Sequence, residues 1–195
     1  MDERAIEQAA DRLERAELAG TLLKNAKSYR AAEAAWTDVL ASLTTFYNKL
    51  EQGAKGHGRS EAWFGREKSL RRKDPLLKYA RIARNCEEHG LERVTHQQPS
   101  GMDERAPIKI GYGEAISFDL VVPNPDGEPD IIPAKILGPT LSLVRVRDSR
   151  SPDFADPPRE HLGQPLLTFG TPSDITEPLI FHMKRMLADA RKFVE

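Results

Sequence analysis

The sequence predicts an α+β fold, with an N-terminal helical bundle, a small antiparallel β region and a C-terminal helix. Twelve of the 14 prolines lie between Pro99 and Pro172, and proline disfavours the interior of a helix. Apolar residues repeat at helical spacing before this stretch and again at the end of the chain. We therefore expect a bundle over residues 1–91, a β region over 92–172 and a helix over 173–195. The last helix packs on either the bundle or the sheet.

The first two helices are expected over residues 2–27 and 28–52. Ser28 has a side chain that suits the N-cap of the second helix. The apolar stripe of the first helix is irregular, whereas that of the second recurs three and four positions apart and defines a clear core face. This face comprises Ala32, Ala35, Trp36, Val39, Leu40, Leu43, Phe46, Tyr47 and Leu50.

Two further helices are expected before the β region. Glycines within residues 53–60 end the second helix, and a short third helix follows. Asp74 and Pro75 then mark the start of a fourth helix, as its N-cap and its first helical residue. This helix continues to about His89, and Gly90 is placed to end it in a left-handed conformation.

The middle of the chain alternates apolar runs with turn-forming residues, a pattern typical of short strands. We expect one strand near residues 93–95, two within 106–123, two within 130–148 and one within 164–169. Helical spacing of apolar residues returns at about Thr176 and continues to the end of the chain.

Composition indicates a cytoplasmic protein without a membrane partner. No apolar run approaches the roughly 20 residues of a membrane helix, and the charged start does not resemble a signal peptide. The single cysteine, Cys86, excludes an internal disulfide and suits a reducing compartment. No spacing is typical of a metal site or of a glycine-rich nucleotide loop, so we expect no metal and no cofactor.

Positive charge is concentrated in one segment of a chain whose net charge is −1. Between Lys55 and Arg84 there are ten Lys or Arg and three Asp or Glu residues, a local excess of 7. Such a segment attracts phosphates, and helices with solvated charge give the same pattern. The candidate RNA-binding residues within it are Lys68, Arg71, Arg72, Lys73 and Arg81.

Arg84, Asn85 and His89 form the motif with the clearest chemistry. A histidine near neutral pKa takes up and returns protons, and an arginine holds a phosphate through two hydrogen bonds. Together they support metal-free cleavage of RNA by attack of the ribose 2′-OH, and Asn85 either orients His89 or binds a phosphate oxygen. On a straight helix Arg84 and His89 are roughly 140° apart. A joint site therefore requires either a bent helix end or a second copy of the helix.

The segment Arg84-Asn85-Cys86-Glu87-Glu88-His89 resembles the R-x(4–6)-H signature of the HEPN superfamily. HEPN domains are all-α bundles, and many are ribonucleases of toxin–antitoxin and anti-phage systems. The resemblance implies a homodimer in which two motifs form one metal-independent site, with Arg84, His89 and Asn85 as its residues. It also implies RNA as substrate and an antitoxin as a partner. It covers residues 1–90 in outline and six residues in detail.

A structural role for the same residues gives the opposing hypothesis. Arg84 and Glu88 have the spacing of an ordinary ion pair, and His89 suits the negative end of the helix dipole. In that case the chain is a non-catalytic interaction or scaffold module that binds a protein partner. A third hypothesis is an RNA-binding protein that uses the basic segment.

Overall fold

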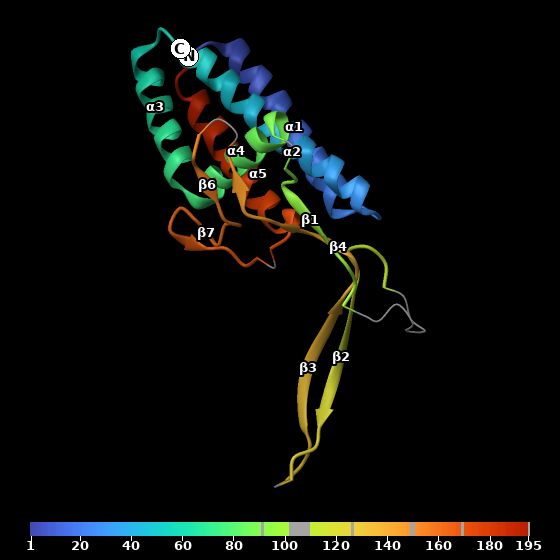
Figure 1. The fold of residues 1–195 in the computed structure, drawn as a ribbon. Coiled ribbons are helices and arrows are strands. Elements are labelled where there is room, and N and C mark those ends of the chain that lie inside the picture. Colours follow the sequence, from blue (N-terminus) through green and yellow to red (C-terminus); the bar gives the residue numbers. More distant parts are fainter. Residues whose placement is uncertain (91, 102–109, 126, 149–150, 169, 195) are drawn as a thin grey trace.

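Four N-terminal helices and one C-terminal helix pack around a shared core, and the β strands come between α4 and α5 (Figure 1). The computed structural model describes residues 1–90, 92–101, 110–125, 127–148, 151–168 and 170–194. Within them the helices are α1 (Glu3–Lys24), α2 (Tyr29–Ala54), α3 (Gly58–Lys73), α4 (Pro75–His89) and α5 (Pro172–Arg191). The α+β fold expected from the sequence is confirmed.

The helices begin where their capping side chains are. The Ser28 hydroxyl accepts a hydrogen bond from the Ala31 N–H at 3.2 Å, and the Asp74 carboxylate accepts one from the Leu77 N–H at 3.0 Å. α5 begins at Pro172, four residues before the expected start. The reason is a capping box, in which Thr171 and Asp174 each accept a hydrogen bond from the other's backbone N–H.

Gly90 ends α4, but not in the expected left-handed conformation. Its φ of −103° and ψ of 170° are extended, while its N–H still bonds to the Cys86 carbonyl at 2.6 Å. A Cβ atom at this position would lie 2.5 Å from that carbonyl oxygen. Glycine is therefore needed here for close approach to the helix end, and a positive φ is not involved.

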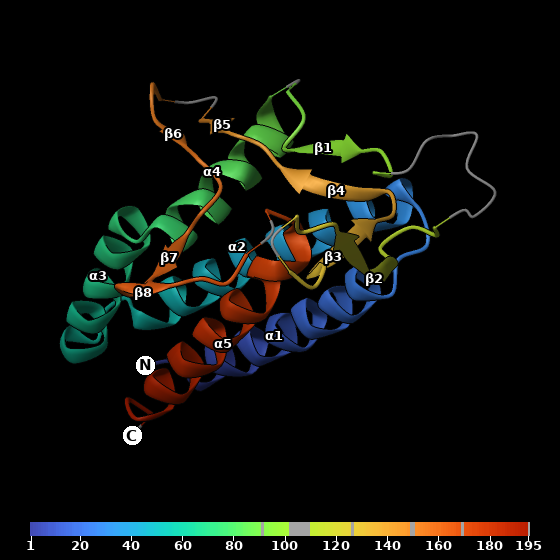
Figure 2. The same ribbon diagram turned by 90° about the horizontal axis from the view of Figure 1, so that it is seen from below.

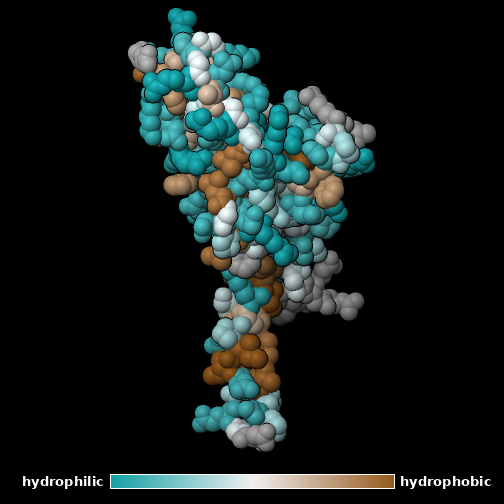
Figure 3. All heavy atoms as spheres, turned by 90° about the vertical axis from the view of Figure 1, so that its left-hand side faces the viewer, coloured by the Kyte–Doolittle hydropathy of each residue, from teal (hydrophilic) through white to brown (hydrophobic). Residues whose placement is uncertain are grey.

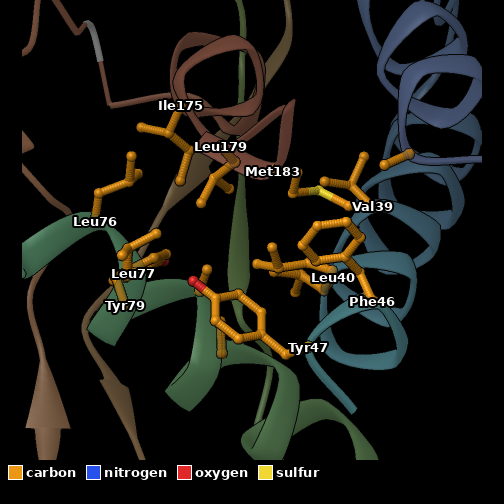
Figure 4. Close-up of a cluster of buried hydrophobic side chains, with 14 of the residues drawn as sticks. Val39, Leu40, Phe46, Tyr47, Leu76, Leu77, Tyr79, Ile175, Leu179 and Met183 are labelled. Atoms are coloured by element: carbon orange, nitrogen blue, oxygen red, sulfur yellow. The ribbon is translucent and has the colours of Figure 1, made fainter. Parts of the chain in front are cut away.

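The core lies between α2, α4 and α5, with α1 packed along α2 and α5 (Figure 4). Each leucine, valine, isoleucine, phenylalanine or methionine side chain that is fully buried in this core contributes about 1.5–3 kcal/mol to the free energy of unfolding. The C-terminal helix thus packs on the bundle, and the β region is an insertion between two bundle helices. The labelled core side chains are Val39, Leu40, Phe46, Tyr47, Leu76, Leu77, Tyr79, Ile175, Leu179 and Met183.

The strands of the described residues form four separate antiparallel pairs and not one continuous sheet. The pairs are β1 (Thr95–Gln98) with β4 (Thr140–Leu143), β2 (Ala115–Val122) with β3 (Asp130–Leu137), β5 (Val146–Arg147) with β6 (Phe154–Ala155), and β7 (Glu160–His161) with β8 (Gln164–Pro165). The strand expected near 93–95 lies slightly later, and the one within 164–169 is only two residues long. Two strands are expected within 106–123; the described residues of this range contain one, β2, and residues 106–109 lie outside them.

Three of these pairs lie close to the bundle. β5, β6 and β7 contact α4, and β4 contacts α2 and α5 (Figure 2). The β2–β3 hairpin instead projects away from the helices as an arm (Figure 1). Within the described part of the chain, no helix is both long and apolar enough to cross a membrane.

Candidate functional site

Arg84 lies in the last two turns of α4 and is paired with carboxylates of its own helix. Its Nη2 atom is 3.4 Å from Glu88 Oε1, and its Nη1 atom is 3.9 Å from Glu87 Oε2. The first of these is the i,i+4 ion pair that the spacing allows. The guanidinium that would hold a phosphate is therefore already compensated by two negative charges.

His89 occupies the other side of the same carboxylate. Its Nε2 atom lies 3.6 Å from Glu88 Oε2, and its side chain is 35% exposed. α4 continues as an α-helix through His89, without a bend that would bring this ring toward Arg84. Glu88 thus lies between the two predicted catalytic residues, and an RNA phosphate that contacts both must displace it.

Asn85 faces the β region. Its Nδ2 atom is 3.3 Å and 3.5 Å from the two Asp148 carboxylate oxygens, and Arg81 Nη1 is 3.2 Å from Asp148 Oδ2. Asp148 is buried, and Arg81 also reaches Asp153 at 3.9 Å. Two predicted site residues, Asn85 and Arg81, therefore attach the segment around β5 and β6 to α4.

A cavity of about 320 Å³ lies beside the end of α4, and its charge is negative. Three carboxylates line it, from Glu33, Glu87 and Glu92, against one guanidinium, from Arg93. The Thr37 hydroxyl donates a hydrogen bond to Glu87 and fixes that side chain in the wall. A surface of this sign repels a phosphate and favours a cationic or neutral group.

The five predicted RNA-binding residues do not form one patch. Lys68 pairs with Glu51 at 2.6 Å, and Arg81 is held by Asp148. Arg71 stacks on the Tyr47 ring, with its guanidinium carbon 4.1 Å from the ring centroid, and burial lowers its pKa. Arg72 and Lys73 remain exposed at the end of α3. Of the five predicted residues, only the neighbours Arg72 and Lys73 thus place two exposed cations at one point.

The sequence did not predict a buried polar network that joins α2, α4, α5 and β7. His161 Nδ1 lies 3.0 Å from Asp74 Oδ1, and the His161 and His182 rings meet edge to face at 5.3 Å. His182 Nε2 in turn lies 3.1 Å from the Tyr47 hydroxyl. Tyr47 and His182 are each 1% exposed, so the inner half of the network is closed to solvent.

Protonation in this network is set by burial and by hydrogen bonds. Burial lowers the pKa of His182 to about 3, and the nearby Arg185 adds to this effect. Burial alone would raise the pKa of Asp74, but hydrogen bonds from Leu162, His161 and Leu77 lower it below its ordinary value. A neutral His182 and an ionised Asp74 stabilise the packing of four elements, which is a structural role.

The β2–β3 arm offers a second candidate surface. Directly opposed residues of an antiparallel pair point to the same face, so alternate pairs define two faces. We call one of them the apolar arm face. It consists of Ile116 with Ile136, Phe118 with Ala134, and Leu120 with Ile132, and it ends toward the tip at the next pair on the same side, Val122 with the charged Asp130.

Four of the six side chains of the apolar arm face are exposed, and Ala134 and Ile136 are half-buried. Phe118 is 38%, Leu120 47% and Ile132 52% exposed. Apolar side chains gather on the projecting arm in Figure 3. The opposite face carries Ser117 with Lys135 and Asp119 with Pro133, and these polar pairs lie between two apolar pairs, Ala115 with Leu137 and Val121 with Ile131. Alternating apolar and polar residues are typical of a strand whose apolar face is covered by another part of the protein. No helix or strand of the described residues covers the apolar arm face.

No group of three or more His, Cys, Asp or Glu side chains in the described residues is arranged to hold a metal ion. Comparison of the chain with protein-family models, curated proteins and solved structures found no match. The HEPN resemblance therefore stays a prediction that rests on the motif in α4.

Proposed function

We propose that this chain is a non-catalytic interaction module, in which a helical bundle holds a projecting hairpin that binds a protein. The observation that carries the proposal is the apolar arm face, whose six side chains include no charge. Contiguous exposed apolar patches of a few hundred Å² on a protein surface are often binding sites. The pairing of Arg84 and Asn85 with carboxylates gives these motif residues structural partners in the same protein.

Photo-crosslinking from single positions tests this function. We would place a benzophenone amino acid at Leu120, on the apolar arm face, or at Val121, its neighbour on the opposite face. We expect covalent protein adducts from position 120 and few from position 121. Equal adduct yields from both positions, or none from either, would contradict the proposed binding surface.

A HEPN-type metal-independent endoribonuclease, active as a homodimer in a toxin or phage-defence system, is a second proposal. The exposed ring of His89 supports it, as does the closure of the bundle by α5, because the β region is then an insertion in a helical domain. Its partners would be RNA and an antitoxin, in the cytoplasm. The carboxylate of Glu88 between the two motif residues weighs against it.

Incubation with total RNA in the presence of a metal chelator separates the two proposals. A nuclease predicts cleavage by the wild type and a loss of about 100-fold or more in His89→Ala. His96→Ala is the matched control, because His96 is exposed in β1, outside the motif. Absence of cleavage, or equal cleavage by all three proteins, would exclude the nuclease. If the chain instead binds RNA through Arg72 and Lys73, RNA in the same samples stays uncleaved and bound to the protein, and added salt releases it.

A further inference from the structure

We infer that the apolar arm face binds the same face of a second copy of this chain, so that the arms of two protomers pack together. This inference rests on the proposed function and names its partner. The first reason is chemical self-complementarity. The face offers no charge and no hydrogen-bonding side chain over three successive cross-strand pairs. Its partner must be a similarly long, uncharged and apolar ridge, and a second copy presents one.

The second reason is the arrangement of side-chain sizes. The central pair sets the large Phe118 beside the small Ala134, with aliphatic pairs above and below. If two arms pack with a two-fold axis parallel to their length, Phe118 of each protomer lies over the partner's Ala134. An axis across the arms would instead set the two Phe118 rings against each other. The parallel arrangement alternates large and small residues across the interface, as well-packed cores do.

Two charged residues of the arm, Lys135 and Asp119, lie on the opposite face, where such packing leaves them in water. Glu128 is near the tip, and Asp130 pairs with Val122 at the tip end of the apolar arm face, where it is exposed beside the packed pairs. The acidic tip also disfavours insertion into a membrane surface, which is usually anionic. Two arms that pack by their apolar arm faces thus bury the three apolar pairs, and none of these six side chains carries a charge.

The area sets the expected strength of the contact. A strand of eight residues is about 26 Å long, and the exposed fractions correspond to roughly 400 Å² of apolar surface on each arm. Two copies then bury roughly 800 Å², below the ~1,200 Å² at which standard specific interfaces begin. We therefore expect a reversible dimer with a dissociation constant on the order of micromolar or weaker.

Analytical ultracentrifugation of the full chain between about 1 and 200 μM, a range chosen to bracket a micromolar dissociation constant, tests the inference. Leu120→Glu places a charge on the apolar arm face, and Val121→Glu places the same charge one residue further on, on the opposite face. We expect a wild-type dimer, a dissociation constant at least about 100-fold weaker in Leu120→Glu, and little change in Val121→Glu. Thermal unfolding of all three proteins checks that the bundle is intact.

Each other result has a defined meaning. A wild type that stays monomeric, or a dimer that survives Leu120→Glu, overturns the inference. Loss of the dimer in both variants overturns the assignment to one face. If the wild type is monomeric but position 120 still crosslinks to another protein, only the second copy is wrong and the interaction module stands.

The two-fold axis has a separate test. Phe118→Cys and Ala134→Cys proteins are mixed and treated with a short bismaleimide, with Cys86 buried in both. A parallel axis predicts that mixed 118–134 crosslinks exceed 118–118 crosslinks. The reverse ratio would overturn this arrangement.

Discussion

At the scale of single residues, a glycine at the end of α4 and a glycine within α3 have different roles. A Cβ at Gly90 would lie 2.5 Å from the Cys86 carbonyl oxygen, whereas a Cβ at Gly65, within α3, would meet nothing within 4 Å. Gly90 is therefore fixed by the close local approach of the chain to the end of its own helix. Gly65 is fixed by no contact and lowers the stability of an exposed helix through its backbone entropy.

We predict that Gly90→Ala destabilises the protein by about 1–3 kcal/mol, because the chain must move away from the end of α4. Gly65→Ala is the control and is expected to stabilise it by about 0.5–1 kcal/mol. Urea unfolding followed by circular dichroism measures both. Equal effects of the two substitutions would mean that Gly90 is not constrained by the Cys86 carbonyl.

At the scale of elements, Asp74 has more partners than a helix cap needs. Its carboxylate accepts hydrogen bonds from Leu77 N–H at the start of α4, from Leu162 N–H at 2.7 Å, and lies 3.0 Å from His161 Nδ1. One side chain thus joins the start of α4 to the β7–β8 turn. Ser28, by comparison, caps α2 through an exposed local hydrogen bond.

We predict that Asp74→Ala costs about 3 kcal/mol, because it removes a cap and leaves His161 and the Leu162 N–H without their buried acceptor. Ser28→Ala should cost about 1 kcal/mol, the usual cost of a lost cap. The difference in the free energy of unfolding between the two variants is the measurement. Similar costs would show that the contact with β7 adds no stability.

At the scale of the whole molecule, the buried histidines tie α2, α4, α5 and β7 together. His182 is held between Tyr47, Glu67, Arg185 and His161, with Asp74 and Arg71 nearby. Burial keeps its pKa near 3 in the folded protein, against about 6.5 when unfolded. As pH falls below 6.5 the unfolded chain therefore binds a proton that the folded one does not.

We predict that stability falls between pH 6.5 and pH 3 with a slope that approaches about 1.4 kcal/mol per pH unit from His182. Asp74 also contributes to the pH dependence, but at a lower pH. Because its pKa is lowered in the folded protein, the stability that its carboxylate provides is lost only under more acidic conditions. Urea unfolding at pH 7, 6, 5 and 4 measures this slope. His182→Gln should flatten it, and exposed His57→Gln should leave it unchanged. A slope that is the same in both variants would contradict this origin.

The helices were predictable because their signals are local. Ser28, Asp74 and Pro75 mark helix starts within a few residues of the groups that they bond, and the apolar spacing of α2 identifies its buried side. The start of α5 was placed too late, because apolar spacing was weighed there and the Thr171–Asp174 capping box was not. The i,i+4 spacing of Arg84 and Glu88 likewise predicted their ion pair.

The sequence by itself thus determined the α+β class, the order of the helices and the Arg84–Glu88 pair, since these depend on neighbours within about four residues. Only the tertiary structure decided that Asn85 meets Asp148, 63 residues away, and that Asp74 meets His161, 87 residues away. It also decided that α5 completes the bundle and that the apolar arm face stays uncovered. Alternation specifies that a strand has an apolar face, but what covers that face depends on where the chain around it packs.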